Sequence, residues 1–233
     1  MNKTLLMMLA LTLGACSRQT EAPPAAPVTE APAPAPVAVP PTPADAPLAA
    51  DLAARLVREH SPVLGPSDAP VTVVEFLDPA CEACRAFAPV VKQILFMHPD
   101  DVRVVVRYAA FHRGSDIAIR MLDAAHRQGK FETALNALFD GQQEWASHHA
   151  PNLDRAWQLV AAAGLDMNRL RRDMGSEQAE SVLRQDGDDV LALKVDRTPT
   201  FFVNGRPLVD FGDRQLFELV NQEVARASGS GGS

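Results

Sequence analysis

The sequence contains only three cysteines and no run of basic residues. Its 233 residues include 22 Lys and Arg against 29 Asp and Glu, which gives a formal net charge of -7. An acidic chain without a basic cluster offers little to a phosphate backbone, so nucleic acid is not expected as a partner. Three cysteines also leave no second thiol pair to complete a four-ligand zinc site, and no resident metal is expected.

Long apolar runs are also absent. Residues 4–13 are predominantly apolar and follow Lys3, but this run is about half of the roughly 20 residues that a spanning helix requires. We interpret residues 1–15 as an export signal that is cleaved. The motif L-G-A-C that ends at Cys16 resembles the lipobox of bacterial lipoproteins, which implies that Cys16 is lipidated. An ordinary signal that happens to end near a cysteine is the alternative.

Residues 16–50 are predicted to form a tether. Ten of the 25 residues from position 23 to position 47 are proline, which fixes φ and withholds an amide donor. Such a stretch favours an extended spacer without a core. By resemblance to known sorting patterns, Ser17 after the lipidated cysteine favours the outer membrane. A folded domain is expected over 51–227, followed by a flexible Gly/Ser tail over 228–233.

A strand, a helix and a second strand are predicted near the start of this domain. Residues 71–76 are β-branched and nearly all apolar, as in a strand buried on both faces, and residues 102–108 are rich in valine. Between them, Cys84, Phe87 and Val91 recur at the spacing of one helix face. This order predicts two parallel strands joined by a helical crossover.

Helices are predicted over most of the following segment. Apolar stripes at helical spacing recur from about 115 to 195. Residues 200–203 then read as a strand, Asn204-Gly205 as a two-residue hairpin turn and residues 206–209 as its partner strand. A last helix follows, marked by a stripe that includes Leu216 and Val220.

The two remaining cysteines, Cys81 and Cys84, are separated by Glu82 and Ala83 at the predicted start of the first helix. Unpaired amides and the helix dipole favour a thiolate there, so Cys81 is predicted to attack a disulfide and Cys84 to resolve the mixed disulfide. A structural disulfide is the alternative, although so short a loop restricts the unfolded chain little. We interpret the pair as a redox centre that needs no bound cofactor.

The segment 71–89, the R-T-P-T stretch that contains Pro199 and the helical block together resemble the DsbA-like branch of the thioredoxin superfamily. The resemblance covers nearly all of residues 65–226. It implies an α/β, thioredoxin-like fold with a helical insertion. It also implies that Pro199 is a cis-proline facing the cysteines, and that the backbone of Thr198 pairs with an incoming peptide.

Glu75 matches the buried acid that lies beneath the disulfide in these families. Burial raises the pKa of such a carboxyl group, so Glu75 is expected to exchange a proton with Cys84. The alternative is an edge-strand carboxylate that faces water.

The loop after the second parallel strand is predicted to lie at the same sheet edge as Cys81, because both parallel strands end there. We hypothesise that His112 or Arg113 in this loop helps to stabilise the Cys81 thiolate. The best-known oxidases carry proline and histidine between their cysteines, whereas a carboxylate beside Cys81 predicts a less oxidising couple. The candidate substrate-binding residues around the redox pair are Thr198, Glu82, Ala83 and His112.

These features predict a periplasmic protein disulfide oxidoreductase that exchanges disulfides with exported proteins. A lipid alone holds it to the membrane, and the direction of electron flow stays open. By family resemblance, a DsbB-like oxidant or a DsbD-like reductant in the membrane resets the pair. The alternative function is a Cu(I)-binding thiol module of a metal-handling system, because Cu(I) suits sulfur ligands. No N-terminal dimerisation helix of convincing length is visible, so a monomer is expected.

Overall fold

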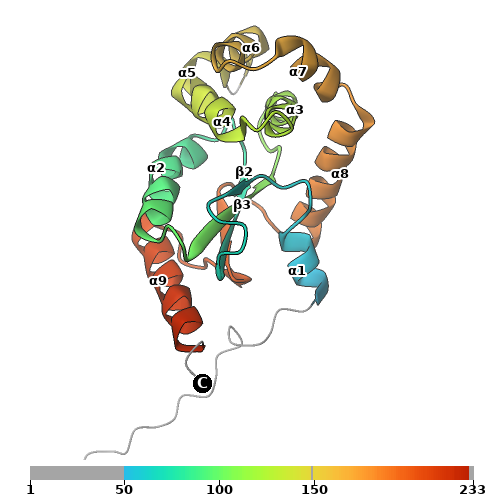
Figure 1. The fold of residues 1–233 in the computed structure, drawn as a ribbon. Helices are drawn as coiled ribbons and strands as arrows, with labels where there is room; N and C mark the ends of the chain where they lie inside the picture. The colour runs from blue at the N-terminus through green and yellow to red at the C-terminus, as the bar shows by residue number, and fades with distance from the viewer. Residues whose placement is uncertain (1–49, 148, 231–233) are drawn as a thin grey trace, which may run out of the picture. The chain divides into compact units, whose positions relative to one another are not determined.

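A mixed sheet forms the centre of the domain (Figure 1). The structure is a computed structural model and describes residues 50–147 and 149–230. The strand order is β1-β3-β2-β4-β5. The strands are β1 (Val63–Leu64), β2 (Val71–Leu77), β3 (Val102–Tyr108), β4 (Thr200–Val203) and β5 (Arg206–Pro207).

Strands β2 and β3 are parallel, with Val71 opposite Val102 and Leu77 opposite Tyr108. The predicted parallel pair is confirmed, and β2 is one residue longer than expected. Strand β4 pairs antiparallel with the other side of β2, which makes β2 the central strand. An internal position on β2 is therefore flanked by a neighbouring strand on each side.

Helices cover both faces of the sheet, as Figure 1 shows. Helices α2 (Glu82–Met97) and α9 (Asp213–Ser230) lie on one face, and α1 (Ala50–Leu56) and α8 (Glu177–Ala192) lie on the other. Side chains of successive residues in a strand point to opposite faces. Val73 and Leu77 accordingly join the larger apolar cluster with α2 and α9, whereas Val74 and Phe76 join the cluster with α1 and α8.

The block between β3 and β4 is helical, which confirms the predicted insertion. Beyond one end of the sheet it continues the larger apolar cluster through residues such as Leu122, Leu138 and Trp145. The indole Nε1 of Trp145 donates to the carbonyl oxygen of Leu138 at 2.8 Å. Besides α8, the block contains α3 (Ser115–His126), α4 (Phe131–Asp140), α5 (Gln142–Trp145), α6 (Leu153–Ala162) and α7 (Met167–Met174).

Two predicted boundaries are wrong. Helix α9 continues to Ser230, so the expected flexible tail does not begin at 228; the Ser228 hydroxyl donates to the Val224 carbonyl one turn earlier, at 3.0 Å. The last strand ends at Pro207 and not at 209. The amide of Leu208 still donates to the carbonyl oxygen of Phe201 at 2.9 Å, but Val209 beyond it is exposed. The expected signal, Cys16 and tether positions 16–49 lie outside the described residues.

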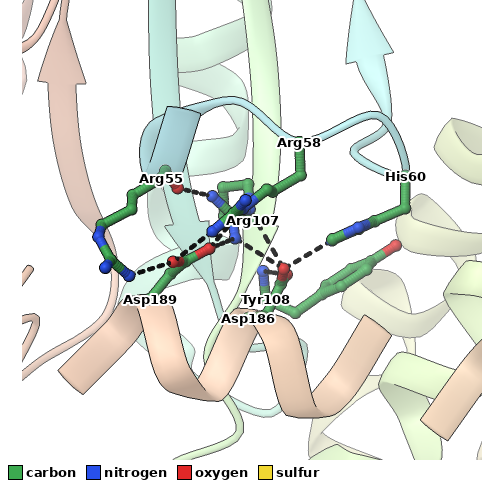
Figure 2. Close-up of polar contacts among 7 residues, drawn as sticks. All are labelled: Arg55, Arg58, His60, Arg107, Tyr108, Asp186 and Asp189. Carbon is green, nitrogen blue, oxygen red and sulfur yellow. Dashed lines mark hydrogen bonds and ion pairs between the residues drawn. The ribbon is translucent and has the colours of Figure 1, made fainter. Parts of the chain in front are cut away.

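A buried ionic network fixes β3 against α8, and Figure 2 shows it. The guanidinium group of Arg107 is fully buried and donates to Asp186 and Asp189 of α8, each at 2.8 Å. It also lies over the ring of Phe76, with its central carbon 5.3 Å from the centroid. Asp186 additionally accepts the backbone amide of Tyr108 at 2.7 Å, so the network holds the carboxyl end of β3.

The same two carboxylates connect the segment around α1 to this core. Arg58 donates to both oxygens of Asp189 at 2.8 Å, and Arg55 reaches one of them at 3.2 Å. His60 contacts Asp186 through Nε2 at 2.6 Å. We call these residues, with Arg107, the Arg107 network.

Candidate active site

The two cysteines lie at the N-terminal end of α2, shortly after β2. Cys81 is the N-cap residue with an extended backbone (φ -77°, ψ 122°), and Cys84 lies one turn further along. Both are free thiols. Cys84 is completely buried, whereas Cys81 keeps 6% of its surface exposed, so only Cys81 is presented for attack.

The environment separates the acidities of the two thiols. A hydrogen bond from the Cys84 thiol lowers the pKa of Cys81 to about 5 against the opposing effect of burial, and Thr198 and the amides of Cys84 and Ala83 act in the same direction. Burial raises the pKa of Cys84 far above its usual range, and the negative charges of Glu75 and Cys81 add to this effect. Near neutral pH the pair therefore presents one thiolate and one protonated thiol.

Glu75 lies on β2 between Val106 of β3 and Phe201 of β4. Its side chain is buried, so the alternative of an edge-strand carboxylate in water is wrong. Burial, together with the charge of Cys81, raises the pKa of Glu75 to about 8. Its Oε1 atom has no hydrogen-bond partner among the described residues. A carboxyl group in this environment is suited to carry a proton at neutral pH.

The loop before β4 lies against Cys81. The Thr198–Pro199 peptide bond is cis, as the resemblance implied. The Sγ atom of Cys81 lies 3.2 Å from the carbonyl oxygen of Thr198. The structure thus brings Thr198 and Pro199 to the redox pair from more than a hundred residues away in the sequence.

His112 and Arg113 are directed to different partners. Nδ1 of His112 lies 2.9 Å from the Asp78 carboxylate. The negative charge of Cys81 is one of the causes that raise the pKa of His112. Arg113 instead donates to the carbonyl oxygen of His149 at 2.8 Å. Of the two candidates in this loop, His112 is the one whose pKa the charge of Cys81 helps to raise. Glu82 is the exposed first residue of α2.

Asp78, the residue directly after β2, was not predicted from the sequence as a site residue. One oxygen of its fully buried carboxylate accepts the amide of Ala80 at 2.8 Å and the hydroxyl of Ser115. The other accepts the amides of Phe111 at 2.8 Å and His112 at 2.9 Å, as well as Nδ1 of the His112 ring. A charged residue following a buried strand, three positions before Cys81, was the available signal.

Gln142 was also missed, because its partners lie about sixty residues earlier in the chain. Its side-chain amide is buried and donates to the carbonyl oxygens of Pro79 at 2.9 Å and Cys81 at 3.0 Å. Its own oxygen accepts from Arg85 of α2 at 2.9 Å. Helix α5 of the insertion therefore holds the loop that leads into the redox pair.

A groove of about 390 Å³, lined by both polar and apolar side chains, adjoins the cis-proline loop. Pro199, Leu208, Val209 and Phe211 contribute to its lining. Val209 is 84% exposed and Phe211 47% exposed, and the Phe211 ring lies 4.6 Å from that of Phe87 on α2. The groove therefore extends from the loop that contacts Cys81 toward the helix that carries it.

Residues 50–147 and 149–230 contain no group of three or more His, Cys, Asp or Glu side chains arranged to hold a metal ion. They also form no helix of sufficient length and apolarity to cross a bilayer.

The fold and the site together define the class of thioredoxin-like thiol–disulfide oxidoreductases. The chain belongs to the thioredoxin family, since the family model described as thioredoxin matches residues 58–220. The fold class expected from the sequence, a thioredoxin-like fold with a helical insertion, is confirmed.

Solved structures support the same assignment. A thioredoxin-like oxidoreductase from Silicibacter pomeroyi is 31% identical, with a TM-score of 0.62 over 74% of this chain and 96% of that one. BdbD from Bacillus subtilis is 24% identical, with a TM-score of 0.64 over 72% and 94% of the two chains. Wolbachia pipientis α-DsbA1, at 14% identity and a TM-score of 0.66 over 75% and 96%, shares the fold.

Curated relatives carry a different name. A Na+/H+ antiporter NhaA from Herminiimonas arsenicoxydans is 32% identical over 166 residues, which are 71% of this chain and 26% of the antiporter. An antiporter from Salinispora tropica is 33% identical over 156 residues, or 64% and 22% of the two chains. This chain thus spans about a quarter of the length of these relatives, and their name describes the whole proteins.

Proposed function

We propose that this protein is a periplasmic enzyme that exchanges disulfides with exported proteins through Cys81 and Cys84. The observation that carries the proposal is the asymmetry of the two thiols. Cys81 keeps 6% of its surface exposed and has a pKa of about 5, whereas Cys84 is completely buried with a pKa raised far above its usual range. A nucleophile that is ionised and accessible next to a protonated resolving thiol is what stepwise exchange requires.

In the reductive direction, the Cys81 thiolate attacks one sulfur of a substrate disulfide, and the other substrate sulfur leaves with the electron pair. In the mixed disulfide Cys81 carries no charge, so one cause of the raised pKa of Glu75 is removed. In its ionised form Glu75 then accepts the proton of Cys84, whose thiolate attacks Sγ of Cys81. The mixed disulfide breaks, the substrate leaves as a dithiol, and the enzyme holds the Cys81–Cys84 disulfide. Oxidation of a substrate dithiol is the same sequence in reverse. The pair itself carries the two electrons, so the proposal includes no bound cofactor.

The surface beside Cys81 favours polypeptide substrates. In the proposed complex, the backbone of Thr198 forms hydrogen bonds with an extended substrate peptide. Pro199 does not interfere with this pairing, because proline has no backbone amide hydrogen. Glu82 and Ala83 contact the same peptide from the start of α2. The groove that contains Phe211 offers apolar area for a side chain of an unfolded client.

Two features act on the redox poise in opposite senses. Glu82 beside Cys81 favours a less oxidising couple than a histidine at that point would give, whereas the low pKa of Cys81 favours a more oxidising one. The reduction potential of the Cys81–Cys84 pair, measured against glutathione, therefore decides whether the enzyme oxidises or reduces its substrates. A membrane partner, either a DsbB-like oxidant or a DsbD-like reductant, resets the pair. The proposal takes the enzyme as a monomer.

The exchange assay tests the proposed function directly. We expect wild-type protein to reduce insulin with a dithiol or to refold reduced ribonuclease, and Cys81→Ser to show only background rates. Cys84→Ser should retain the first attack and accumulate a mixed disulfide with the substrate, visible on non-reducing gels. Cys16→Ser in every variant removes the third thiol and serves as the reference.

A Cu(I) titration of the same reference protein separates the proposal from the metal-binding alternative. Tight Cu(I) binding without disulfide exchange would contradict the oxidoreductase and support the thiol module. The strongly raised pKa of Cys84 opposes that alternative, since a metal-binding thiol must lose its proton.

The proposed location is the periplasmic face of the outer membrane, with a lipid on Cys16 and the segment up to position 50 as tether. A structural neighbour at 18% identity is described as a periplasmic thioredoxin-like protein from Salmonella enterica, which supports the compartment. In cells, Cys16→Ser should move the protein from the membrane fraction to the soluble periplasmic fraction and remove the lipid mass. Equal membrane association of wild type and variant would contradict the lipid anchor.

A further inference from the structure

Asp78 is a fully buried carboxylate with one ionisable donor. Four of the five hydrogen bonds to its side chain come from uncharged groups, namely three backbone amides and the Ser115 hydroxyl. The fifth comes from Nδ1 of His112 at 2.9 Å. A buried charge is costly unless it is paired, and among the described residues the His112 ring is the group that can supply the opposite charge to Asp78.

Asp78 also connects the two loops that meet at this edge of the sheet. Its carbonyl oxygen accepts the amide of Cys81 at 3.1 Å, while its carboxylate holds both the amide and the ring of His112. Since Nδ1 donates to Asp78, the second proton of the charged ring is on Nε2. The orientation of the imidazole is thereby set by the same residue that positions the backbone of the nucleophile.

We propose that Asp78 is a positioning residue that keeps His112 protonated beside Cys81, and that the His112 imidazolium stabilises the Cys81 thiolate during exchange. The inference rests on the proposed function, and it assigns separate ionisable groups to the two sulfurs. Glu75 serves the buried Cys84 by proton transfer, and His112 serves Cys81 by its charge.

The charges around His112 support this assignment. Burial opposes the charged ring, but the hydrogen bond and charge of Asp78, with the negative charges of Cys81 and Glu82, outweigh it and raise the pKa of His112. Arg113, the adjacent cation of the same loop, is engaged with the His149 carbonyl instead. The His112 side chain is 27% exposed, so its interaction with Cys81 is partly screened by solvent.

The charge acts at one defined step. When a second substrate thiolate attacks the substrate sulfur of the mixed disulfide, the bond to Cys81 breaks and its electron pair stays on Sγ of Cys81. The substrate now holds a disulfide, and the Cys81–Cys84 pair has gained the two electrons that the substrate lost. The imidazolium keeps its proton throughout and offsets the new negative charge. In the opposite direction, the same charge raises the fraction of Cys81 that is ionised before attack.

The first test needs no substitution near Asp78. Disulfide formation removes the charge of Cys81, so the pKa of His112, followed by NMR, should be lower in the oxidised protein than in the reduced protein by about half a unit to one unit. Linkage requires His112→Gln to raise the pKa of Cys81 by a similar amount, measured from thiolate absorbance or from alkylation rate against pH. Equal His112 pKa values in the two redox states would overturn the proposal.

A double-variant cycle then tests the role of Asp78. Asp78→Asn should lower the pKa of His112 and raise that of Cys81 as much as His112→Gln does, and the double variant should add nothing further. Arg113→Ala is the matched control and should leave the pKa of Cys81 unchanged.

Independent, additive effects of the two variants would show that Asp78 is merely structural and contradict its positioning role. If Asp78→Asn does not fold, the comparison of oxidised and reduced wild type still decides. If the protein exchanges disulfides but the pKa values of His112 and Cys81 are not coupled, only this inference is contradicted. If the two pKa values are coupled but the protein exchanges no disulfides, only the proposed function is contradicted.

Discussion

Glu75→Gln should make the reduced protein more stable than wild type at alkaline pH. Burial raises the pKa of Glu75 from an ordinary value of 4.5 to about 8, so between these values the folded protein keeps a proton that the unfolded chain has lost. Folding stability of the wild type therefore falls as pH rises through this window, by an amount on the order of 4 kcal/mol at pH 8. Glutamine carries no charge and removes that loss.

Urea unfolding at pH 5 and pH 8.5 measures this effect. The free energies of wild type and Glu75→Gln should be close at pH 5, and the variant should be more stable by several kcal/mol at pH 8.5. Glu177→Gln, which removes an exposed carboxylate at the start of α8, should keep the pH slope of the wild type. A stability difference that is the same at both pH values would show that Glu75 does not titrate in this window.

The same substitution should slow the resolving half of the exchange. Because a glutamine side chain at this position cannot accept the Cys84 proton, the mixed disulfide should persist longer, while alkylation of Cys81 should be affected less. Stability and turnover would then move in opposite directions, which is typical of a buried ionisable group retained for chemistry.

Asp189→Ala should cause a large loss of stability. Asp189 is buried and accepts from Arg107, Arg58 and Arg55, so its removal leaves the guanidinium of Arg107 buried with part of its counter-charge missing. Breaking a buried pair in this way costs about 3–5 kcal/mol. Asp186 is the other carboxylate of the Arg107 network drawn in Figure 2, and it would then be the remaining counter-charge of Arg107 there.

Urea unfolding at pH 7 checks this expectation against a surface pair. Arg214 and Glu218 approach to 3.8 Å with both side chains largely exposed, and Glu218→Ala should change stability by less than about 1 kcal/mol. Burial opposes ionisation of Asp189, but Arg58 and Arg107 hold its pKa below the usual value of 3.8. Its contribution is thus present above that value and declines as pH falls further. A loss similar to that of Glu218→Ala at pH 7 would contradict the account.

Local patterns predicted strands β2 to β5 and the redox pair, because both depend on short segments of sequence. Strand β3 has the predicted bounds, and β2 differs by one residue, since runs of β-branched apolar residues favour a buried strand. The two-residue spacing of the cysteines after such a strand was visible without any tertiary information. The boundary errors occurred at element ends, where β5 stops at Pro207 and α9 extends to Ser230. The two-residue strand β1, which pairs with β3, was not predicted.

The amino-acid order by itself determined the main strands, the helical segments and the redox pair, because apolar periodicity and the spacing of Cys81 and Cys84 are properties of short segments. The role of Glu75 as a buried acid was implied by the resemblance of these segments to a known family. Only the tertiary structure decided which polar groups surround them. Asp78 meets His112 across 34 positions, Gln142 reaches Cys81 across 61, and Arg107 reaches Asp189 across 82. Such pairs leave no periodic trace in the sequence, since their energy depends on burial and geometry that arise only when distant segments pack together.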